Sequence, residues 1–339
     1  MTQAKTLPRI YNQVHMPRKH VSGRRRFSIY VTWSYPGEAN RSLSELDNRF
    51  STMTEVRRVE WPHWEEPEWS DPLCFQQGIS GALELFFRAW LPFQKVIMET
   101  TGFDVPVYQR VDQAGYRQPL DAAILADTDT LMLWGLDHSV TEQIPSTEEI
   151  EAVRHFLTRE GTCLVVGPHH EIGVSSDREV QEMEHRHHGD ELVPRQQRFA
   201  AYTRELLKAL EIPVENRYGL RPAIVPGSKN EIAPLSIARD LDTRGWLKGV
   251  RTFNFHKHLP HYAVTDESAK NIRVLAKQPI DVSKPHPFVQ AGNTEFNTLV
   301  WVMPEGKRAG DVLFADSTEF STLFGGTDSL SQFWHNLAR

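Results

Sequence analysis

Short apolar runs alternate with amphipathic segments along this chain. The runs FSIYVTW (27–33), TLMLWG (130–135) and TCLVVG (162–167) consist mainly of apolar residues, several of them aromatic or β-branched, and predict buried strands. Between the second and third runs, apolar residues recur at helical spacing in PSTEEIEAVRHFLTREG (145–161). Strand, helix and strand together have the length of a parallel βαβ crossover.

The helix predicted over 145–161 has clear signals at both ends. Ser146 and Glu149 form a capping box, and Gly161 suits the position just past the last turn. Helical periodicity also predicts helices at about 79–101, with a kink at Pro92, and at 199–212 and 328–338. Further apolar runs predict strands at 105–111, 250–258, 272–278, 297–304 and 310–316. Because strands and helices alternate, the expected fold class is α/β, an open, mostly parallel sheet flanked by helices.

The chain is expected to form an N-terminal arm, residues 1–26, followed by a single α/β domain over residues 27–339. Within that domain, residues 59–78 are expected to form a loop rich in tryptophan and proline, and residues 174–197 a polar, histidine-rich insertion. The basic run PRKHVSGRRR (17–26) is interpreted as part of a solvated arm rather than as a site for a polyanion.

The composition argues against a nucleic-acid-binding, membrane-spanning or disulfide-rich secreted protein. The net charge of −6 gives no general affinity for nucleic acid, and no apolar stretch is both long enough and free enough of charge to span a membrane. The first residues lack the apolar core of a secretory signal. Two cysteines, Cys74 and Cys163, make no disulfide framework and fit a reducing compartment. We therefore expect a cytoplasmic protein that acts on a small molecule, without nucleic-acid or membrane partners. The sequence leaves open whether the protein forms a homo-oligomer.

Polar residues follow four of the predicted strands. In open α/β sheets, ligands bind beyond the carboxyl ends of the strands, so residues at those ends are site candidates. The stretch LVVGPHHEIG (164–173) is the most informative, because a buried strand breaks at Pro168 and delivers two histidines and a glutamate. The candidates at the four strand ends are Ser34, Tyr35, Glu38, Asp137, His138, His169, His170, Glu171, Asp316, Ser317 and Glu319.

Two further histidine groups occur in HRHHGDE (185–191) and HKHLPH (256–261). On a strand, His256 and His258 would point to the same face, where two imidazoles can chelate one ion. Histidine and carboxylate ligands suit zinc or non-haem iron. The predicted ligands of a divalent ion are His169, His170, His185, His187, His188, His256, His258 and His261. Each group also has a structural interpretation, as histidines that are solvated or hydrogen-bonded to neighbours.

Three segments resemble the class I glutamine-amidotransferase-like superfamily: LMLWGLDHS (131–139), the region from STEEIEAV to GPHHEIG (146–173), and GDVLFADSTEF onward (310–338). The likeness is to divergent members without a standard catalytic triad, and it implies a flavodoxin-like or amidotransferase-like sandwich. Amidotransferases of this class place a nucleophilic cysteine in a G-x-C-x-G turn after the strand. Here that turn reads GPHHEIG, and Cys163 lies at the opposite end of the strand, which argues against a cysteine-based glutaminase.

These observations predict a metal-dependent enzyme for a small polar molecule, in which a zinc or iron ion activates water for hydrolysis. The choice of a C–N bond follows from the resemblance alone. Glu171 or Asp137 would serve as general base. The predicted substrate-binding residues are His138, Arg221, Tyr35 and Glu319. Three alternatives stay open: a non-haem iron oxygenase, a catalytically silent amidotransferase-like domain that binds a ligand or partner, and a cysteine hydrolase using Cys163.

Overall fold

The computed structural model describes residues 17–33, 89–110, 118–137, 143–189, 197–228 and 231–339. Its centre is an eight-stranded sheet in the order β2-β1-β3-β4-β12-β11-β10-β8. The parallel strands are β2 (Val107–Arg110), β1 (Phe27–Trp33), β3 (Thr130–Leu136), β4 (Cys163–Pro168) and β12 (Asp311–Phe314). The antiparallel strands are β11 (Glu295–Val302), β10 (Ile272–Pro279) and β8 (Ser236–Ile237). The predicted α/β class with a mostly parallel sheet is confirmed.

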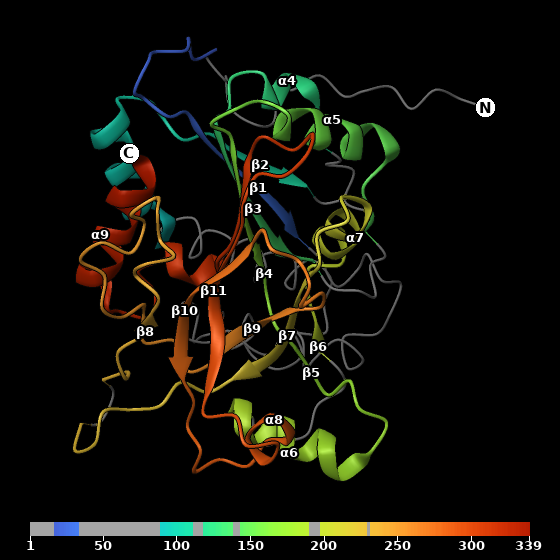
Figure 1. The fold of residues 1–339 in the computed structure, drawn as a ribbon, viewed down its shortest axis with the longest axis vertical. Coiled ribbons are helices and arrows are strands. Elements are labelled where there is room, and N and C mark those ends of the chain that lie inside the picture. The colour runs from blue at the N-terminus through green and yellow to red at the C-terminus, as the bar shows by residue number, and fades with distance from the viewer. Residues whose placement is uncertain (1–16, 34–88, 111–117, 138–142, 190–196, 229–230) are drawn as a thin grey trace, which may run out of the picture.

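Helices cover both faces of this sheet, as Figure 1 shows. The helix over residues 89–101 and α9 (Thr327–Ala338) contribute Trp90 and Phe333 to the core on one face. The helices on the other face are α4 (Ala122–Leu125), α5 (Thr147–Leu157) and α7 (Ala201–Ala209). Because the central strands are buried on both faces, they consist almost entirely of apolar residues.

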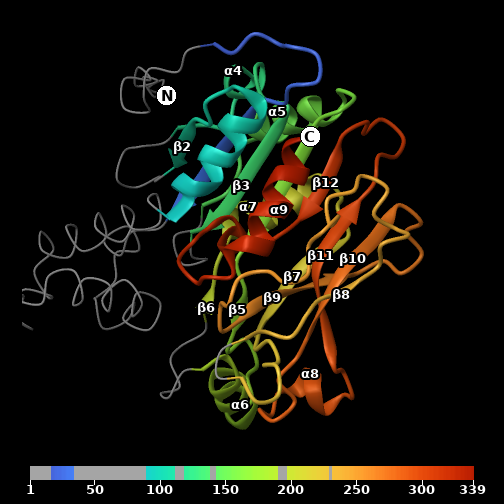
Figure 2. The ribbon, with the colours of Figure 1, turned by 90° about the vertical axis from the view of Figure 1, so that its left-hand side faces the viewer.

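Beyond the carboxyl ends of the parallel strands, the chain builds a smaller region, seen at the bottom of Figure 2. It contains β5 (Glu171–Ile172), β6 (Gln197–Arg198), β7 (Val214–Leu220), β9 (Leu259–Val264), α6 (Arg178–His188) and α8 (Pro287–Gln290). The 3₁₀-helix η4 (Ser317–Phe320) follows β12 at the same end. Since β4 leads into β5 and β12 leads into η4, this region lies directly against the strand ends where ligands are expected.

The capping box of α5 is confirmed. The Ser146 side chain accepts a hydrogen bond from the Glu149 backbone, and the Glu149 carboxylate accepts one from the Ser146 backbone at 2.8 Å. The same carboxylate forms a buried ion pair with Arg110 of β2 and accepts a hydrogen bond from the Tyr202 hydroxyl of α7 at 3.2 Å. One buried acid therefore ties the start of α5 to both β2 and α7.

Three features differ from expectation. The strand predicted over 250–258 is wrong, because that segment has irregular backbone. The histidine-rich insertion contains α6, which the hydrophobic pattern does not reveal. In the basic arm, Arg18 and Arg26 are buried rather than solvated, and they pair with Asp127 and Asp129 at 3.4 and 2.6 Å.

The predicted loop over 59–78 and the first part of the 79–101 helix lie outside the described residues. The division into an arm and one α/β domain stays a prediction. Within the part of the chain that the structure describes, no helix combines the length and apolar character needed to cross a membrane.

Candidate metal centre

The site begins at the carboxyl end of β4. A Cβ atom on Gly167 would lie 2.8 Å from the Ser317 backbone nitrogen, so only glycine lets β4 pass this close to the turn after β12. This approach places His169 beside Asp316, with Nδ1 of the ring 3.3 Å from the carboxylate. The Asp316 side chain is fully buried and that of His169 is 14% exposed, so Asp316 lies behind a ring that still reaches solvent.

His170 contacts the end of α6. Its Nε2 lies 3.0 Å from Nε2 of His188, the last residue of that helix. Gly219 of β7 packs against both rings, because a Cβ atom there would lie 2.5 Å from Cδ2 of His188 and 3.1 Å from Cδ2 of His170. The pairing of β7 with β9 is irregular at this point, and Tyr218 has a left-handed φ of 51°. Such irregularities commonly re-aim the backbone beside a functional site.

His256 and His258 reach the same place from the irregular segment before β9. Their ring centroids lie 4.1 Å apart, and His258 stacks on His188 with centroids 3.6 Å apart. The Asn254 side chain holds the segment, because it accepts a hydrogen bond from the His256 backbone and donates one to the Thr318 carbonyl. Side-chain hydrogen bonds therefore take the place of a strand ladder here.

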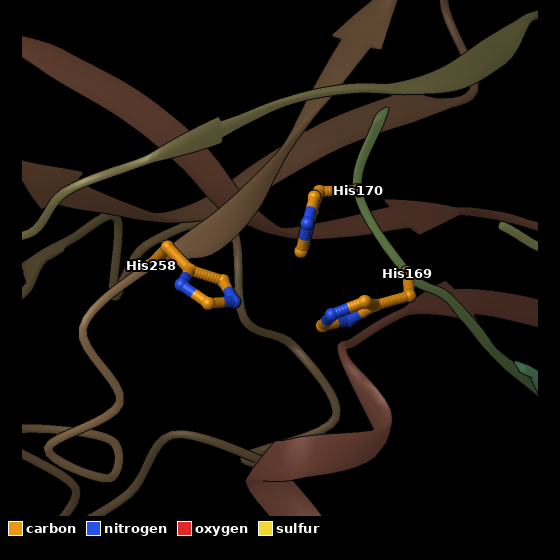
Figure 3. Close-up of side chains that lie close together, drawn as sticks. All are labelled: His169, His170 and His258. Atoms are coloured by element: carbon orange, nitrogen blue, oxygen red, sulfur yellow. The ribbon is translucent and has the colours of Figure 1, made fainter. Parts of the chain in front are cut away.

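Five histidines from three chain segments thus form one cluster: His169, His170, His188, His256 and His258. His169, His170 and His258 each have one donor nitrogen within 4.8 Å of the other two. Figure 3 shows these three side chains close together. Two imidazole nitrogens on one zinc ion are at most about 4 Å apart, so small ring rotations would bring these three to an ion. Nδ1 of His170 is buried and has no hydrogen-bond partner among the described residues, which fits a metal ligand.

The protonation states in the cluster suit a cation. Burial lowers the pKa of His170 and His258 well below the ordinary value and that of His256 to about 3, and neighbouring imidazoles lower these pKa values further. Burial alone would raise the pKa of Asp316, but His169 and His256 hold it below its usual value. Near neutral pH, these three imidazoles are therefore neutral and this carboxylate is ionised, as metal binding requires.

Three predicted ligands, His185, His187 and His261, lie outside the five-histidine cluster. His187 accepts a hydrogen bond from the Arg221 backbone through Nε2 at 2.9 Å, and its Nδ1 donates to a backbone carbonyl at 3.0 Å. His261 accepts one from the Asn297 backbone at 3.2 Å. Both neutral rings have used their lone pair, so the structure assigns them to backbone hydrogen bonds instead of the ion. His185 is buried on α6 and is not part of the group with metal-binding spacing.

The two predicted general bases have different surroundings. The Asp137 carboxylate accepts hydrogen bonds from the Thr32 hydroxyl at 2.5 Å and the Tyr202 backbone at 2.9 Å, and burial raises its pKa. It therefore anchors the start of α7, which is a structural role. Glu171 follows His170 directly and pairs with Arg204 at 3.4 Å. Of the two, Glu171 stays a candidate base.

The predicted substrate-binding residues are dispersed. Burial, followed by the nearby Asp316, raises the pKa of Glu319 well above its ordinary value, and this side chain accepts a hydrogen bond from Thr298 at 3.2 Å. Glu319 is thus a buried neutral acid behind the cluster. The Arg221 guanidinium lies beside Gly189, at the end of α6. The remaining two, Tyr35 and His138, lie outside the described residues.

Asp316, a strand-end candidate to which the sequence gives no specific role, lies beside His169. The structure also adds residues that the sequence analysis does not name as candidates. Gly219 has no local signal, because only the folded chain brings it against two imidazoles. Two half-buried aromatic rings flank the cluster: Phe199 lies 5.5 Å from His169, and Phe324 lies 3.9 Å from His256, between centroids.

Comparison with known proteins gives distant structural likenesses. No family model matches the chain, and no curated protein matches it. The mmIFT52 N-terminal domain is similar over 72% of this chain and 85% of its own, with 9% identity and a TM-score of 0.43. A protein from Bacteroides uniformis described as ThuA-like is similar over 95% and 94%, with 9% identity and a TM-score of 0.38. Likenesses this distant identify no chemistry, so function is argued from the residues.

Proposed function

We propose that this protein is a metal-dependent hydrolase whose ion is held by His169, His170 and His258. The observation that carries the proposal is the convergence of their donor atoms within 4.8 Å. Nδ1 of His170, buried without a partner among the described residues, supports it. Three protein ligands leave a coordination position open for water, as in catalytic zinc sites. A divalent ion there would lower the pKa of a bound water to about 7 and polarise a carbonyl group.

The carboxylate arrangement favours hydrolysis over oxygenase chemistry. A non-haem iron oxygenase uses two histidines and one carboxylate as direct ligands. Here Asp316 lies against Nδ1 of His169, on the ring atom that an outer carboxylate would orient. We therefore prefer zinc, three histidine ligands and hydrolysis of a C–N bond in a small polar molecule. Glu171, next to His170 in the chain, is the proposed base.

Metal analysis tests the centre. Protein purified without a histidine tag should contain about one equivalent of zinc, or take it up from a buffered zinc solution. His169→Ala, His170→Ala and His258→Ala should each abolish this binding. His155→Ala is the matched control, because His155 is exposed on α5. Wild-type protein that binds no zinc, iron or other divalent ion would refute the proposal.

A substrate panel tests the reaction class. Linear and cyclic amides should be hydrolysed by the zinc-loaded protein, with activity lost on chelation and restored by zinc. Oxygen consumption with ferrous iron would favour the oxygenase instead. A folded protein that takes up zinc but turns over neither amides nor esters would favour a silent binding domain.

A further inference from the structure

The contact between His170 and His188 has a consequence for metal binding. Their Nε2 atoms lie 3.0 Å apart, so one nitrogen must donate a proton and the other must accept it. If Nε2 of His170 is the donor, Nδ1 of His170 carries a lone pair. If Nε2 of His188 is the donor, Nδ1 of His170 carries a proton in a buried position without a partner among the described residues. Only the first arrangement presents a lone pair to an ion.

We propose that His188 is a positioning residue of the metal centre, which holds His170 in the tautomer that binds the ion through Nδ1. This inference rests on the proposed function and goes beyond it, because it assigns the donor atom and the residue that selects it. Histidine ligands commonly donate their second N–H to an outer group that fixes tautomer and ring orientation. His188 would serve His170 in this way, as Asp316 serves His169 at 3.3 Å.

The packing around His188 supports this role. Its ring stacks on His258 with an interplanar angle of 26°, so it touches two of the three proposed ligands. On the other side, the bare backbone of Gly219 approaches Cδ2 of His188 so closely that a Cβ atom there would lie 2.5 Å away. The ring is therefore enclosed between β7 and His258, and its Nε2 can keep a fixed direction toward His170.

Two substitutions separate the hydrogen bond from the packing. His188→Phe keeps a flat ring over His258 but removes the acceptor, whereas His188→Gln keeps a side-chain oxygen that can accept from Nε2 of His170. Zinc affinity, measured by chelator competition, should fall by about 10- to 100-fold in His188→Phe. It should stay within about threefold of wild type in His188→Gln. His155→Gln is the control and should not change the affinity.

Nitrogen NMR of the metal-free wild-type protein gives a readout that needs no variant. Long-range proton–nitrogen spectra should show His170 protonated at Nε2, and protonation at Nδ1 would overturn the inference. If wild-type protein binds zinc and His188→Phe binds it equally well, the positioning role fails while the proposed metal centre stands. If wild-type protein binds no divalent ion, both fail.

Discussion

Replacing His286 with asparagine should make the fold less sensitive to acid. His286 is fully buried at the start of α8, where its Nδ1 accepts a hydrogen bond from the Phe288 backbone at 3.0 Å. Its ring faces His187 and Tyr218, with centroids 4.9 and 5.1 Å away. Asparagine is a good helix cap and can accept the same hydrogen bond, but it does not titrate.

The expected change in the free energy of unfolding follows from the difference in the pKa of His286 between the folded and unfolded protein. Burial, and then the neighbouring His187, lowers the pKa of His286 from its ordinary value of 6.5 to about 3. The neutral ring therefore contributes stability that is present above pH 6.5 and is lost as pH falls toward 3, because the unfolded chain takes up a proton that the folded chain excludes. Between pH 7 and pH 5 this loss is about 2 kcal/mol for a single histidine.

Urea unfolding at pH 7.0 and pH 5.0, in the presence of a chelator, measures the effect. From pH 7.0 to pH 5.0, the free energy of unfolding of the wild type should fall by about 2 kcal/mol more than that of His286→Asn. Burial lowers the pKa of His261 to about 4, so His261 adds its own pH dependence, but that contribution is the same in both proteins. His155→Asn, at an exposed position, should behave like wild type. If the free energy of unfolding of His286→Asn falls as much as that of wild type between pH 7.0 and pH 5.0, the conclusion that His286 is buried in its neutral form is wrong.

Three further substitutions or treatments test other parts of the structure. Glu149→Gln should lower the free energy of unfolding by about 3–5 kcal/mol in urea titrations, because it removes the negative charge that forms the buried ion pair with Arg110; a loss below 1 kcal/mol would contradict this. Burial raises the pKa of the Cys163 thiol to about 12, so iodoacetamide at pH 8 should spare Cys163 in native protein and modify it in urea, as peptide mass spectrometry can show. Gly167→Ala should destabilise the fold by about 1–3 kcal/mol and weaken zinc binding, because its Cβ would meet Ser317; unchanged unfolding and affinity would count against that contact.

The central sheet could be predicted because its signals are local. β3, α5 and β4 each carry an apolar run or a capping motif within about a dozen residues, and their order implies a parallel crossover. The same reasoning placed His169, His170 and Asp316 at the carboxyl ends of their strands. The order of the strands was not predicted, and it is the pairing of β4 with β12 that brings these two distant segments together.

The smaller region was harder to predict because α6 buries polar side chains and the segment before β9 is irregular. In α6, the buried residues are Glu184, His185, His187 and His188, so the helix shows no apolar stripe. The segment before β9 has apolar residues at Phe253 and Phe255, but several of its backbone N–H groups bond to side chains instead of a neighbouring strand. Arg251 and Thr252 donate to the Ser329 hydroxyl, and His256 donates to Asn254.

The same geometry explains why a cluster of histidines in sequence is only partly a cluster in space. Successive residues on a helix point about 100° apart, so His187 and His188 cannot face one ion. His188 turns toward His170, whereas His187 turns toward the backbone of Arg221. Histidine density in the sequence therefore indicated the segments that meet in the cluster, while the secondary structure decides which imidazole of each group reaches it. Metal binding that depends on His170 and His258 but not on His187 is what this division requires.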